Sequence, residues 1–551
     1  MKFLNWLLYE VHRWLGIALA VFMFGWFFSG LVIMYSTPTT QTRSQQLAHA
    51  ETLSPETGWL SLGEAWDKSA EQRKQQQAAH KAKPQASNAM QHGGGGETKP
   101  NGDIPLAIAD ARLVRSHGQP LWRVEDSRGQ RYALSAIDGS LQQINAEQAI
   151  QIAKNWFKTG DHETPLAVSY IEALEKSGFL RNQDALSPFH HIAVGDHGDE
   201  LLISARTGEV LHASTRADRA FYYAGNWIHL FKPLDALGWG DVRHDVQLWS
   251  GLGATIASLT GLIIGWIRWR PGFAGKKTYS EGRTQPYREF WFKWHFWSGL
   301  LGGTMALFWA FSGFIDTNPG KVFSNGDITK QELSRYQGSE IPEIVKNWQP
   351  ASLGFNQAGD VVELVWRRLG TESVLLAVDR AGNRIPQAIE GTQPVFSEAS
   401  QRAAVQRLVG DVQLASIEKL EQYDSYYYPR HNQGLVEKPL PVLLVQVADD
   451  AQTQLYIDPQ DGRLLSKLDS SRRLLRWLYS ALHHWDFGWL SYRPIWDLWM
   501  VTWVGLGLVL GGTSLVIGWK RLKKTFAPSK KRKTAARAVT TGKLATESSS
   551  G

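Results

Sequence analysis

Four long stretches of the chain are apolar and free of charged residues. They span Trp14–Ser36, Val246–Ile267, Trp294–Ile315 and Leu498–Trp519. A helix needs about 20 residues to cross a hydrocarbon core of about 30 Å, and each stretch reaches that length. The alternative is a buried helix of a soluble protein, but these stretches are long, apolar on all sides and end near Trp, Arg or Lys, which favours a membrane span. The pattern therefore predicts four transmembrane helices.

Between the first and second stretches, and again between the third and fourth, the pattern changes to short alternating segments. Apolar and polar residues alternate on both sides of a Gly-containing turn, which is typical of β-hairpins. Four hairpins are predicted, two in each region: Arg131–Leu141, Leu201–Leu211, Val374–Ile385 and Gln454–Leu465. Helical periodicity at Ala146–Phe157 and at Ser397–Val409 follows the first hairpin of each region. Each region is therefore predicted to hold two small α+β units.

The chain also repeats itself. Shifting the first apolar stretch by 283 positions aligns it with the third, with seven identities: His12, Trp14, Gly16, Trp26, Phe28, Ser29 and Gly30 match His295, Trp297, Gly299, Trp309, Phe311, Ser312 and Gly313. The second and fourth stretches match more loosely, through Gly265-Trp266 and Gly518-Trp519. The third stretch is internal and cannot be a signal peptide, so its likeness to the first predicts that the first is a retained helix too.

The distribution of charge predicts the orientation. Arg268–Lys293 carries seven basic residues against two acids, and the tail from Lys520 onward carries ten against one. Basic residues mark the cytoplasmic side, so both termini and the middle loop are predicted to be cytoplasmic and the hairpin regions periplasmic. The net charge of +7 therefore reflects topology and contact with membrane lipid, and no nucleic-acid partner is expected.

Two features of the composition narrow the chemistry. The chain has 25 Trp, a residue that gathers at membrane surfaces, and it has no Cys, which excludes disulfides, iron–sulfur clusters and cysteine nucleophiles. The predicted cytoplasmic segments are short and contain no Gly-x-Gly-x-x-Gly after a strand. The electron donor of any redox reaction would therefore be another molecule.

The predicted fold class is an α-helical membrane bundle of four transmembrane helices, with an internal tandem repeat and α+β periplasmic domains. A segment rich in Gln, Ala, Lys and Gly, residues 72–103, is predicted to be a disordered loop in the first periplasmic arm. The predicted boundaries are 1–36 for the N-terminus and first helix, 37–243 for the first arm, 244–269, 291–315 and 496–520 for the other helices, 270–290 for the cytoplasmic loop, 316–495 for the second arm and 521–551 for the basic tail.

The order of helix, hairpin-bearing arm and helix, repeated once, resembles the PepSY-associated transmembrane family. The hairpins with their Asp-x-x-Gly turns and the HRxLG-like motif at His12–Gly16 are similar to the hallmarks of that family. The resemblance implies PepSY-like units in the arms and a place in the bacterial inner membrane. Similar members include ferric-siderophore reductases that carry two b-type haems.

A b-type haem in a membrane needs two neutral imidazoles on facing helices at a similar depth. His12 and His295 meet this requirement, because the repeat places them at the same, cytoplasmic, level. Each is followed four residues later by a glycine, Gly16 or Gly299, where a flat macrocycle can approach the backbone. We therefore predict haem ligation by His12 and His295. The alternative is that both histidines cap helices or lie among lipid headgroups.

On the outer side there are four candidates, His229, His244, His483 and His484. The repeat matches His229 with His483, whereas His244 lies closer to its transmembrane stretch. We name His244 and His483 as iron ligands and keep His229 and His484 as further haem-binding candidates, because the sequence alone does not select two of the four.

The resemblance and the histidines together predict a di-haem b reductase. It would carry electrons from a cytoplasmic or quinol donor to a periplasmic acceptor, with a ferric siderophore as the expected substrate. Two alternatives stay open. One is a haem-free PepSY protein that binds or regulates a partner, and the other is a haem electron carrier for another periplasmic redox protein.

Three other clusters are weaker candidates. His190, His191 and His197 suggest a metal site, and Tyr426–Tyr428 with Arg430 and His431 suggest a cradle for an anionic chelate. An exposed turn and an aromatic packing surface are the simpler interpretations. Ser29 and Ser312 have no base nearby along their helices and read as small residues at helix contacts.

The orientation can be tested by fusing alkaline phosphatase, which is active only in the periplasm, to the C-terminus. The basic tail predicts an inactive fusion, and a fusion placed after residue 320 is predicted to be active. High phosphatase activity at the C-terminus would contradict the predicted topology.

Overall fold

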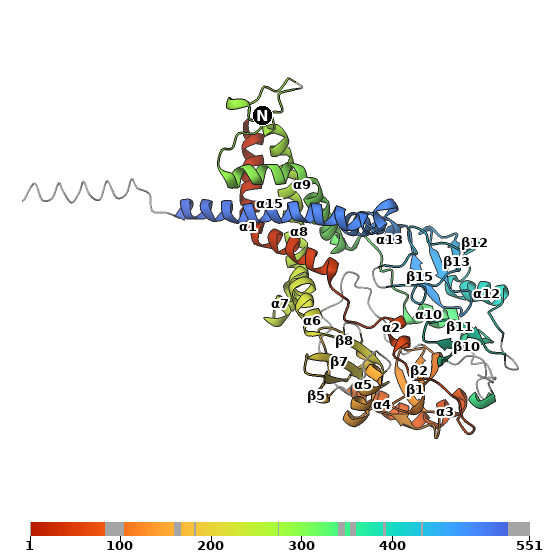
Figure 1. Cartoon of the computed structure of the whole chain (residues 1–551). Helices are drawn as coiled ribbons and strands as arrows, with labels where there is room; N and C mark the ends of the chain where they lie inside the picture. The colour runs from red at the N-terminus through yellow and green to blue at the C-terminus, as the bar shows by residue number, and fades with distance from the viewer. Residues whose placement is uncertain are drawn as a thin grey trace, which may run out of the picture. The chain divides into compact units, whose positions relative to one another are not determined.

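The chain folds into two compact units (Figure 1). The bundle comprises Met1–Met34, Ala224–Pro319 and Tyr479–Gly551, and the arms comprise Tyr35–Tyr223 and Gly320–Leu478. The computed structural model describes residues 2–82, 104–158, 167–180, 183–273, 275–339, 348–352, 360–388, 393–430 and 433–526.

Among the described residues, four helices are long and apolar enough to cross a membrane, as predicted: α1 (Lys2–Tyr35), α8 (Arg243–Arg268), α9 (Phe290–Asp316) and α15 (Ile495–Phe526). The protein is therefore a multi-pass membrane protein. Two helices extend beyond the predicted spans, because α1 starts at Lys2 and α15 continues through four basic residues to Phe526. Lys and Arg are good helix formers, and their long side chains can reach the headgroup region from a helix end.

Glycines bring these helices into close contact. A Cβ atom added at Gly251, Gly302 or Gly511 would lie 3.2 Å or less from an atom of the neighbouring helix. These contacts join α8 to α9 (Gly251 to Phe314), α9 to α15 (Gly302 to Leu506) and α15 to α1 (Gly511 to Phe24). Small residues allow backbones to approach inside a membrane, where apolar side chains alone give helices little reason to associate.

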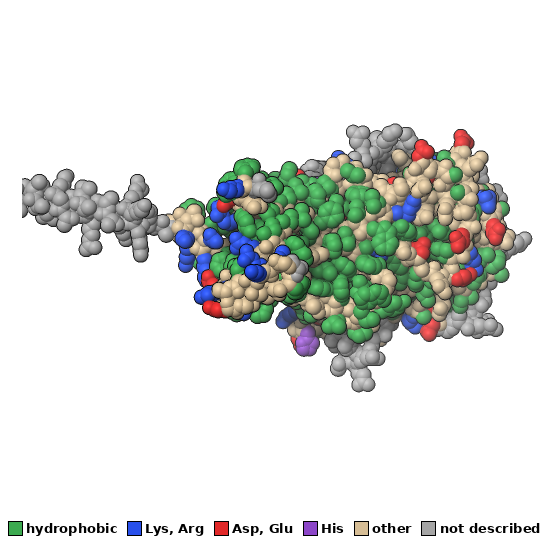
Figure 2. Space-filling view, turned by 90° about the horizontal axis from the view of Figure 1, so that it is seen from above, with side chains coloured by type: hydrophobic (Ala, Val, Ile, Leu, Met, Phe, Trp, Pro, Cys, Tyr) green, Lys and Arg blue, Asp and Glu red, His purple; other side chains and the backbone are tan. Residues whose placement is uncertain are grey.

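Large apolar side chains cover the outside of the bundle. Val21, Leu259, Leu301 and Leu498 are all exposed, as residues that face lipid should be. Figure 2 shows hydrophobic side chains over much of the face in view, with Lys and Arg gathered at one end.

The arms contain an antiparallel sheet of seven strands in the order β11-β10-β9-β1-β2-β3-β4. The strands are β1 (Ile108–Ser116), β2 (Gln119–Asp126), β3 (Arg131–Ser135), β4 (Leu141–Gln142), β9 (Val361–Leu369), β10 (Glu372–Asp379) and β11 (Arg384–Pro386). The predicted first units of the two arms are therefore not separate, because β1 of one arm pairs with β9 of the other.

The register of this central pair is symmetric. Arg112 pairs with Val365, which lies 253 positions later in the chain. The residues on either side of this pair also face each other, Leu113 with Leu364 and Ala111 with Trp366. A two-fold axis through the first pair therefore relates β1 to β9. Each strand would otherwise be an open sheet edge, so their pairing satisfies both rows of backbone groups.

Each arm also has a four-stranded antiparallel sheet and a helix. In the first arm β5 (Val168–Leu174), β6 (Phe189–Val194), β7 (Asp199–Ser204) and β8 (Val210–Ser214) accompany α5 (Ala146–Lys158). In the second arm β12 (Leu414–Leu420), β13 (Val442–Val447), β14 (Gln454–Ile457) and β15 (Leu464–Leu468) accompany α12 (Glu398–Val409). The four predicted hairpins and the two predicted helices are all present.

The segment predicted to be a disordered loop, 72–103, is partly helical. Residues up to Ala82 belong to α4 (Ala70–Ala82), and residues 83–103 lie outside the described residues. The guanidinium of Arg73 lies 3.2 Å from the ring centre of Trp66, and Gln77 Nε2 donates to the hydroxyl of Tyr132 at 2.6 Å. These contacts hold the first third of the segment, whose composition also suits a helix.

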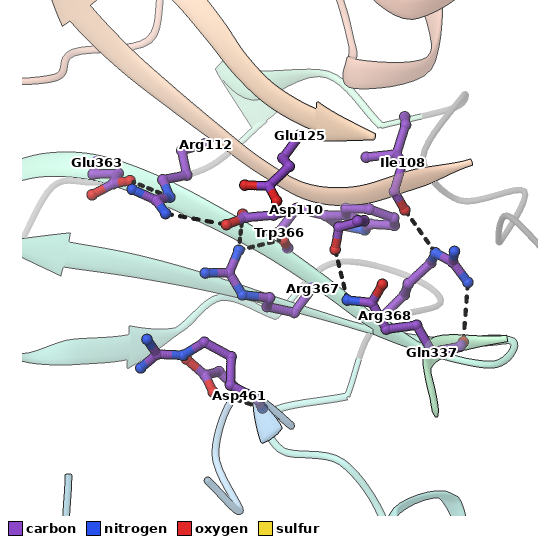
Figure 3. A network of polar contacts seen from close by, with 12 residues as sticks. Ile108, Asp110, Arg112, Glu125, Gln337, Glu363, Trp366, Arg367, Arg368 and Asp461 are labelled. Carbon is purple, nitrogen blue, oxygen red and sulfur yellow. Dashed lines mark hydrogen bonds and ion pairs between the residues drawn. The ribbon is translucent and has the colours of Figure 1, made fainter. Parts of the chain in front are cut away.

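Buried ion pairs cross the seven-stranded sheet (Figure 3). Glu363 on β9 is 1% exposed and pairs with Arg43 and with Arg112, whose Nε lies 3.5 Å away. Arg112 also pairs with Asp110 at 3.1 Å, and Asp110 pairs with Arg367. Burial favours a raised pKa for the Asp110 carboxyl, but the guanidiniums of Arg367 and Arg112 outweigh it and hold that pKa well below its ordinary value.

We expect Glu363→Ala to destabilise β1 and β9 by about 1–3 kcal/mol, because it removes the carboxylate shared by the half-buried guanidiniums of Arg43 and Arg112. Amide hydrogen exchange of these strands in the full chain should become correspondingly faster. Glu71→Ala is the control, since Glu71 and Lys74 form an exposed pair on α4 worth at most about 1 kcal/mol. Unchanged exchange in β1 and β9 would contradict a stabilising role for Glu363.

Candidate functional site

Two histidine pairs lie inside the bundle, one near each end. The loop end is the end where residues 269–289 connect α8 to α9, and the arm end is where the chain passes into and out of the arms. His12 of α1 and His295 of α9 form the pair at the loop end. His229 and His483 form the pair at the arm end.

The loop-end rings face each other with centroids 6.3 Å apart and planes inclined by 46°. His12 Nδ1 lies 3.0 Å from the carbonyl oxygen of Ala257 on α8. A carbonyl only accepts, so His12 carries its proton on Nδ1. His295 Nδ1 lies 3.3 Å from Thr513 Oγ1 and 3.4 Å from Ser514 Oγ on α15. Each ring is therefore held through Nδ1 by the next membrane-spanning helix along the chain, His12 by α8 and His295 by α15.

Gly261 on α8 makes room for the His12 ring. A Cβ at this position would lie 2.7 Å from His12 Cε1, closer than side-chain atoms pack. The two glycines that the sequence analysis singled out have other surroundings. In the part of the chain that the structure describes, no other segment comes within 4 Å of a Cβ placed at Gly16, and at Gly299 the neighbour is Leu510 Cδ1 at 3.5 Å. The space beside Gly16 is therefore open.

The arm-end rings have centroids 6.1 Å apart and planes inclined by 79°. His229 Nδ1 lies 3.0 Å from Ser29 Oγ of α1, and His483 Nδ1 lies 2.9 Å from Ser312 Oγ of α9. The same two helices that supply the loop-end histidines therefore supply the partners of the arm-end histidines.

The backbone around each arm-end histidine has the same form. A π-helical turn precedes it, Tyr223–Trp227 before His229 and Arg476–Ala481 before His483. A residue in the left-handed region follows two positions later, Phe231 with φ 52° and Trp485 with φ 54°. Non-glycine residues rarely adopt this conformation, so the chain turns sharply at equivalent points after both histidines.

The two pairs lie far apart along the bundle. Ser29 follows His12 by 17 positions, and Ser312 follows His295 by the same 17. At about 1.5 Å per residue the two levels are roughly 25 Å apart. Phe27 and Trp309 lie close to the arm-end pair, with ring centroids 5.9 Å apart in an edge-to-face contact.

The paired rings suit a single metal atom with two axial ligands. Two imidazoles bound in line to one metal, each through a bond of about 2 Å, have ring centres roughly 6 Å apart. Both observed separations fit this value. The hydrogen bonds of Ala257, Thr513, Ser29 and Ser312 to these four rings all go to Nδ1, which leaves Nε2 available as the ligand atom.

The other two outer candidates are not part of the pair. His244 is exposed at the start of α8, where its Nε2 lies 3.1 Å from the carbonyl oxygen of Thr317. The structure thus brings His229, and not His244, to His483. The ring of His484 packs beside His483 and Tyr479, with centroids 5.4 and 5.5 Å away. His483, the residue before His484, occupies the position opposite His229.

The weaker candidates have structural partners. His190 is buried with its Nε2 2.6 Å from the carbonyl oxygen of Ile144, and His191 pairs with Glu200 at 3.0 Å. Within the described ranges there is no group of three or more His, Asp or Glu side chains that could hold a metal ion. Tyr427 is fully buried and stacks on Tyr456, while His431 lies outside the described residues.

Sequence reasoning missed the serines. Ser29 and Ser312 were interpreted as helix-contact residues, because no basic group lies near either one on its own helix. Their histidine partners come from segments about 170–200 positions away. The sequence gives one clue to these residues, because Ser29 and Ser312 align in the internal repeat, but the alignment does not show which residues they contact.

Comparison with known families gives one match. The profile of the PepSY-associated TM region matches residues 9–362, which include the first three membrane-spanning helices. A comparison with curated proteins finds no match. Because the matched residues make up more than half of the chain, the protein belongs to the family defined by the PepSY-associated TM region.

Proposed function

We propose that the protein is an inner-membrane electron-transfer protein with two b-type haems, which reduces a ferric siderophore in the periplasm. The observation that carries the proposal is the geometry of the two histidine pairs. Both have ring separations of about 6 Å that suit a shared metal, and both are bonded through Nδ1. In this proposal His12 and His295 hold the loop-end haem, and His229 and His483 hold the arm-end haem.

The donor set favours haem over a free metal ion. A structural zinc site takes four protein ligands and a catalytic one takes three, whereas each pair here offers two imidazoles. The described residues supply no third metal-binding side chain to make a larger cluster. A haem brings four nitrogen ligands of its own and needs only the two axial positions from the protein. Two neutral imidazoles in an apolar bundle meet that need.

The chain's own residues hold and shield the ligand atoms. When bound, a haem iron with two imidazole ligands supplies a one-electron couple between Fe(III) and Fe(II). Ala257 and Thr513 orient the loop-end rings, and Ser29 and Ser312 orient the arm-end rings. These hydrogen bonds hold the half-buried rings within the bundle with Nε2 free to bind a metal.

Two haems would give an electron a path across the membrane. The levels of the two pairs are roughly 25 Å apart, close to the thickness of a hydrocarbon core. Phe27 and Trp309 place aromatic rings next to the arm-end pair. A donor such as a quinol or a soluble reductant would deliver electrons at the loop end, and the acceptor would receive them at the arm end.

The arms support an acceptor on the outer side. They hold the greater part of the folded chain outside the bundle, and charge distribution predicts that they lie in the periplasm. A siderophore holds Fe(III) through hard oxygen atoms and holds Fe(II) much less tightly, so one-electron reduction releases the iron.

Substitution of either member of a pair should remove the same haem. We expect His12→Ala and His295→Ala each to lower haem content from two per chain to one, with the arm-end haem retained. His229→Ala and His483→Ala should remove the other haem. Haem content is measured by the pyridine haemochrome assay on purified protein.

His244→Ala and His484→Ala are the matched controls, because both residues lie at the arm end but outside the pair. Both variants should keep two haems. Full haem content in His12→Ala or His229→Ala would remove that residue from the ligands.

A ferric siderophore should reoxidise the reduced protein. After reduction with dithionite, addition of a ferric hydroxamate or catecholate chelate should restore the oxidised haem spectrum, with ferrous iron trapped by a chelating dye. The rate should fall at least tenfold in His229→Ala, because the arm-end haem is the proposed exit, and should be unchanged in His244→Ala. Reduced haems that ignore every ferric chelate but react with a periplasmic redox protein would show an electron carrier instead.

A further inference from the structure

The sequence Trp-x-x-Ser-Gly occurs twice at equivalent positions, as Trp26–Gly30 on α1 and as Trp309–Gly313 on α9. Haem ligation by four histidines does not by itself require these residues. In the structure, however, all three residues of each copy surround one arm-end histidine. This placement suggests a role in the site that helix packing alone does not explain.

The tryptophans hold the backbone of the arm-end histidines. The indole Nε1 of Trp26 donates to the carbonyl oxygen of His229 at 3.2 Å, and that of Trp309 donates to the carbonyl oxygen of His483 at 3.0 Å. The glycine of each motif lies beside the ring. A Cβ at Gly30 would be 3.8 Å from His229 Cε1, and one at Gly313 would be 3.9 Å from His483 Cε1.

The serine hydroxyls contact the rings themselves, at 3.0 Å from His229 Nδ1 and 2.9 Å from His483 Nδ1. Each serine is 0% exposed, so water does not compete for these bonds. A hydroxyl has one proton to donate. Ser29 Oγ lies 2.6 Å from the carbonyl oxygen of Gly25, and Ser312 Oγ lies 3.1 Å from that of Trp309, and both oxygens can only accept.

The direction of the hydrogen bonds follows from this. When each hydroxyl proton is donated to its helix carbonyl, the serine oxygen accepts from the ring, and in that arrangement Nδ1 carries the proton. The Nε2 atom of each ring then holds the lone pair. Both rings of the pair are therefore fixed in the tautomer that can bind a metal through Nε2.

We propose that Ser29 and Ser312 are positioning residues of the arm-end site, which orient His229 and His483 and set the electron density on their Nε2 atoms. An acceptor at Nδ1 makes an imidazole a stronger electron donor to its metal and so stabilises Fe(III) relative to Fe(II). Removing either hydroxyl therefore raises the midpoint potential of the arm-end haem. The inference rests on the proposed function.

The test uses the full chain in the His12→Ala background, where the arm-end haem is the one expected to remain. Ser29→Ala and Ser312→Ala should each raise its midpoint potential in a redox titration, and the double variant should raise it by about the sum. Ser29→Thr and Ser312→Thr keep a hydroxyl and should restore the original potential. Ser298→Ala is the control, because Ser298 is equally buried on α9 and bonds to the carbonyl of Trp294 at 2.7 Å.

The outcomes separate this inference from the proposed function. Potentials and haem spectra that stay unchanged in both Ser→Ala variants, at full haem content, would overturn the inference and leave the di-haem proposal standing. If the Ser→Ala variants lose haem and the Thr variants retain it, the result supports the positioning role of the serines. If the Thr variants lose haem equally, the result contradicts that role. A parent protein without haem refutes the proposed function itself.

Discussion

Each of the four half-buried imidazoles inside the bundle needs an acceptor for its Nδ1–H, and the way this need is met connects the helices of the bundle. A buried polar group without a hydrogen-bond partner costs about 1–3 kcal/mol, so four unpaired rings would strongly destabilise the bundle. Ala257 on α8 and Thr513 on α15 serve the loop-end rings. The two serines serve the arm-end rings from α1 and α9. All four membrane-spanning helices therefore contribute either a histidine or its partner.

The same requirement explains the close packing of the helices. A hydrogen bond of 3.0 Å from an imidazole on α1 to a backbone carbonyl on α8 is possible because Gly261 has no side chain to separate the two helices at that level. Close approach between α15 and α1 likewise depends on Gly511, which lies against the backbone of Phe24. Glycines in this bundle thus serve both the association of the helices and the geometry of the rings.

Much of the architecture was predictable because membrane spans and hairpins are local patterns. His12 and His295 could be paired because both lie within helices that align at a fixed offset. The choice of His229 over His244 could not be made, since it depends on a π-helical turn and a left-handed residue that rotate the ring of His229 toward α1. The pairing of β1 with β9 joins residues 253 positions apart, and the local sequence of an edge strand does not specify such a partner. The composition of α4 suits both a helix and a disordered segment. The contact of Arg73 with Trp66, which joins α4 to the preceding helix, favours the helix.

The central claim is that each histidine pair binds one haem, and the most direct test is the spectrum and haem content of the purified protein. The account predicts two b-type haems per chain, both six-coordinate with two imidazole ligands, with a Soret band and separate α and β bands after reduction with dithionite. A colourless protein obtained from cells supplied with ample haem, or a spectrum of five-coordinate haem, would contradict it.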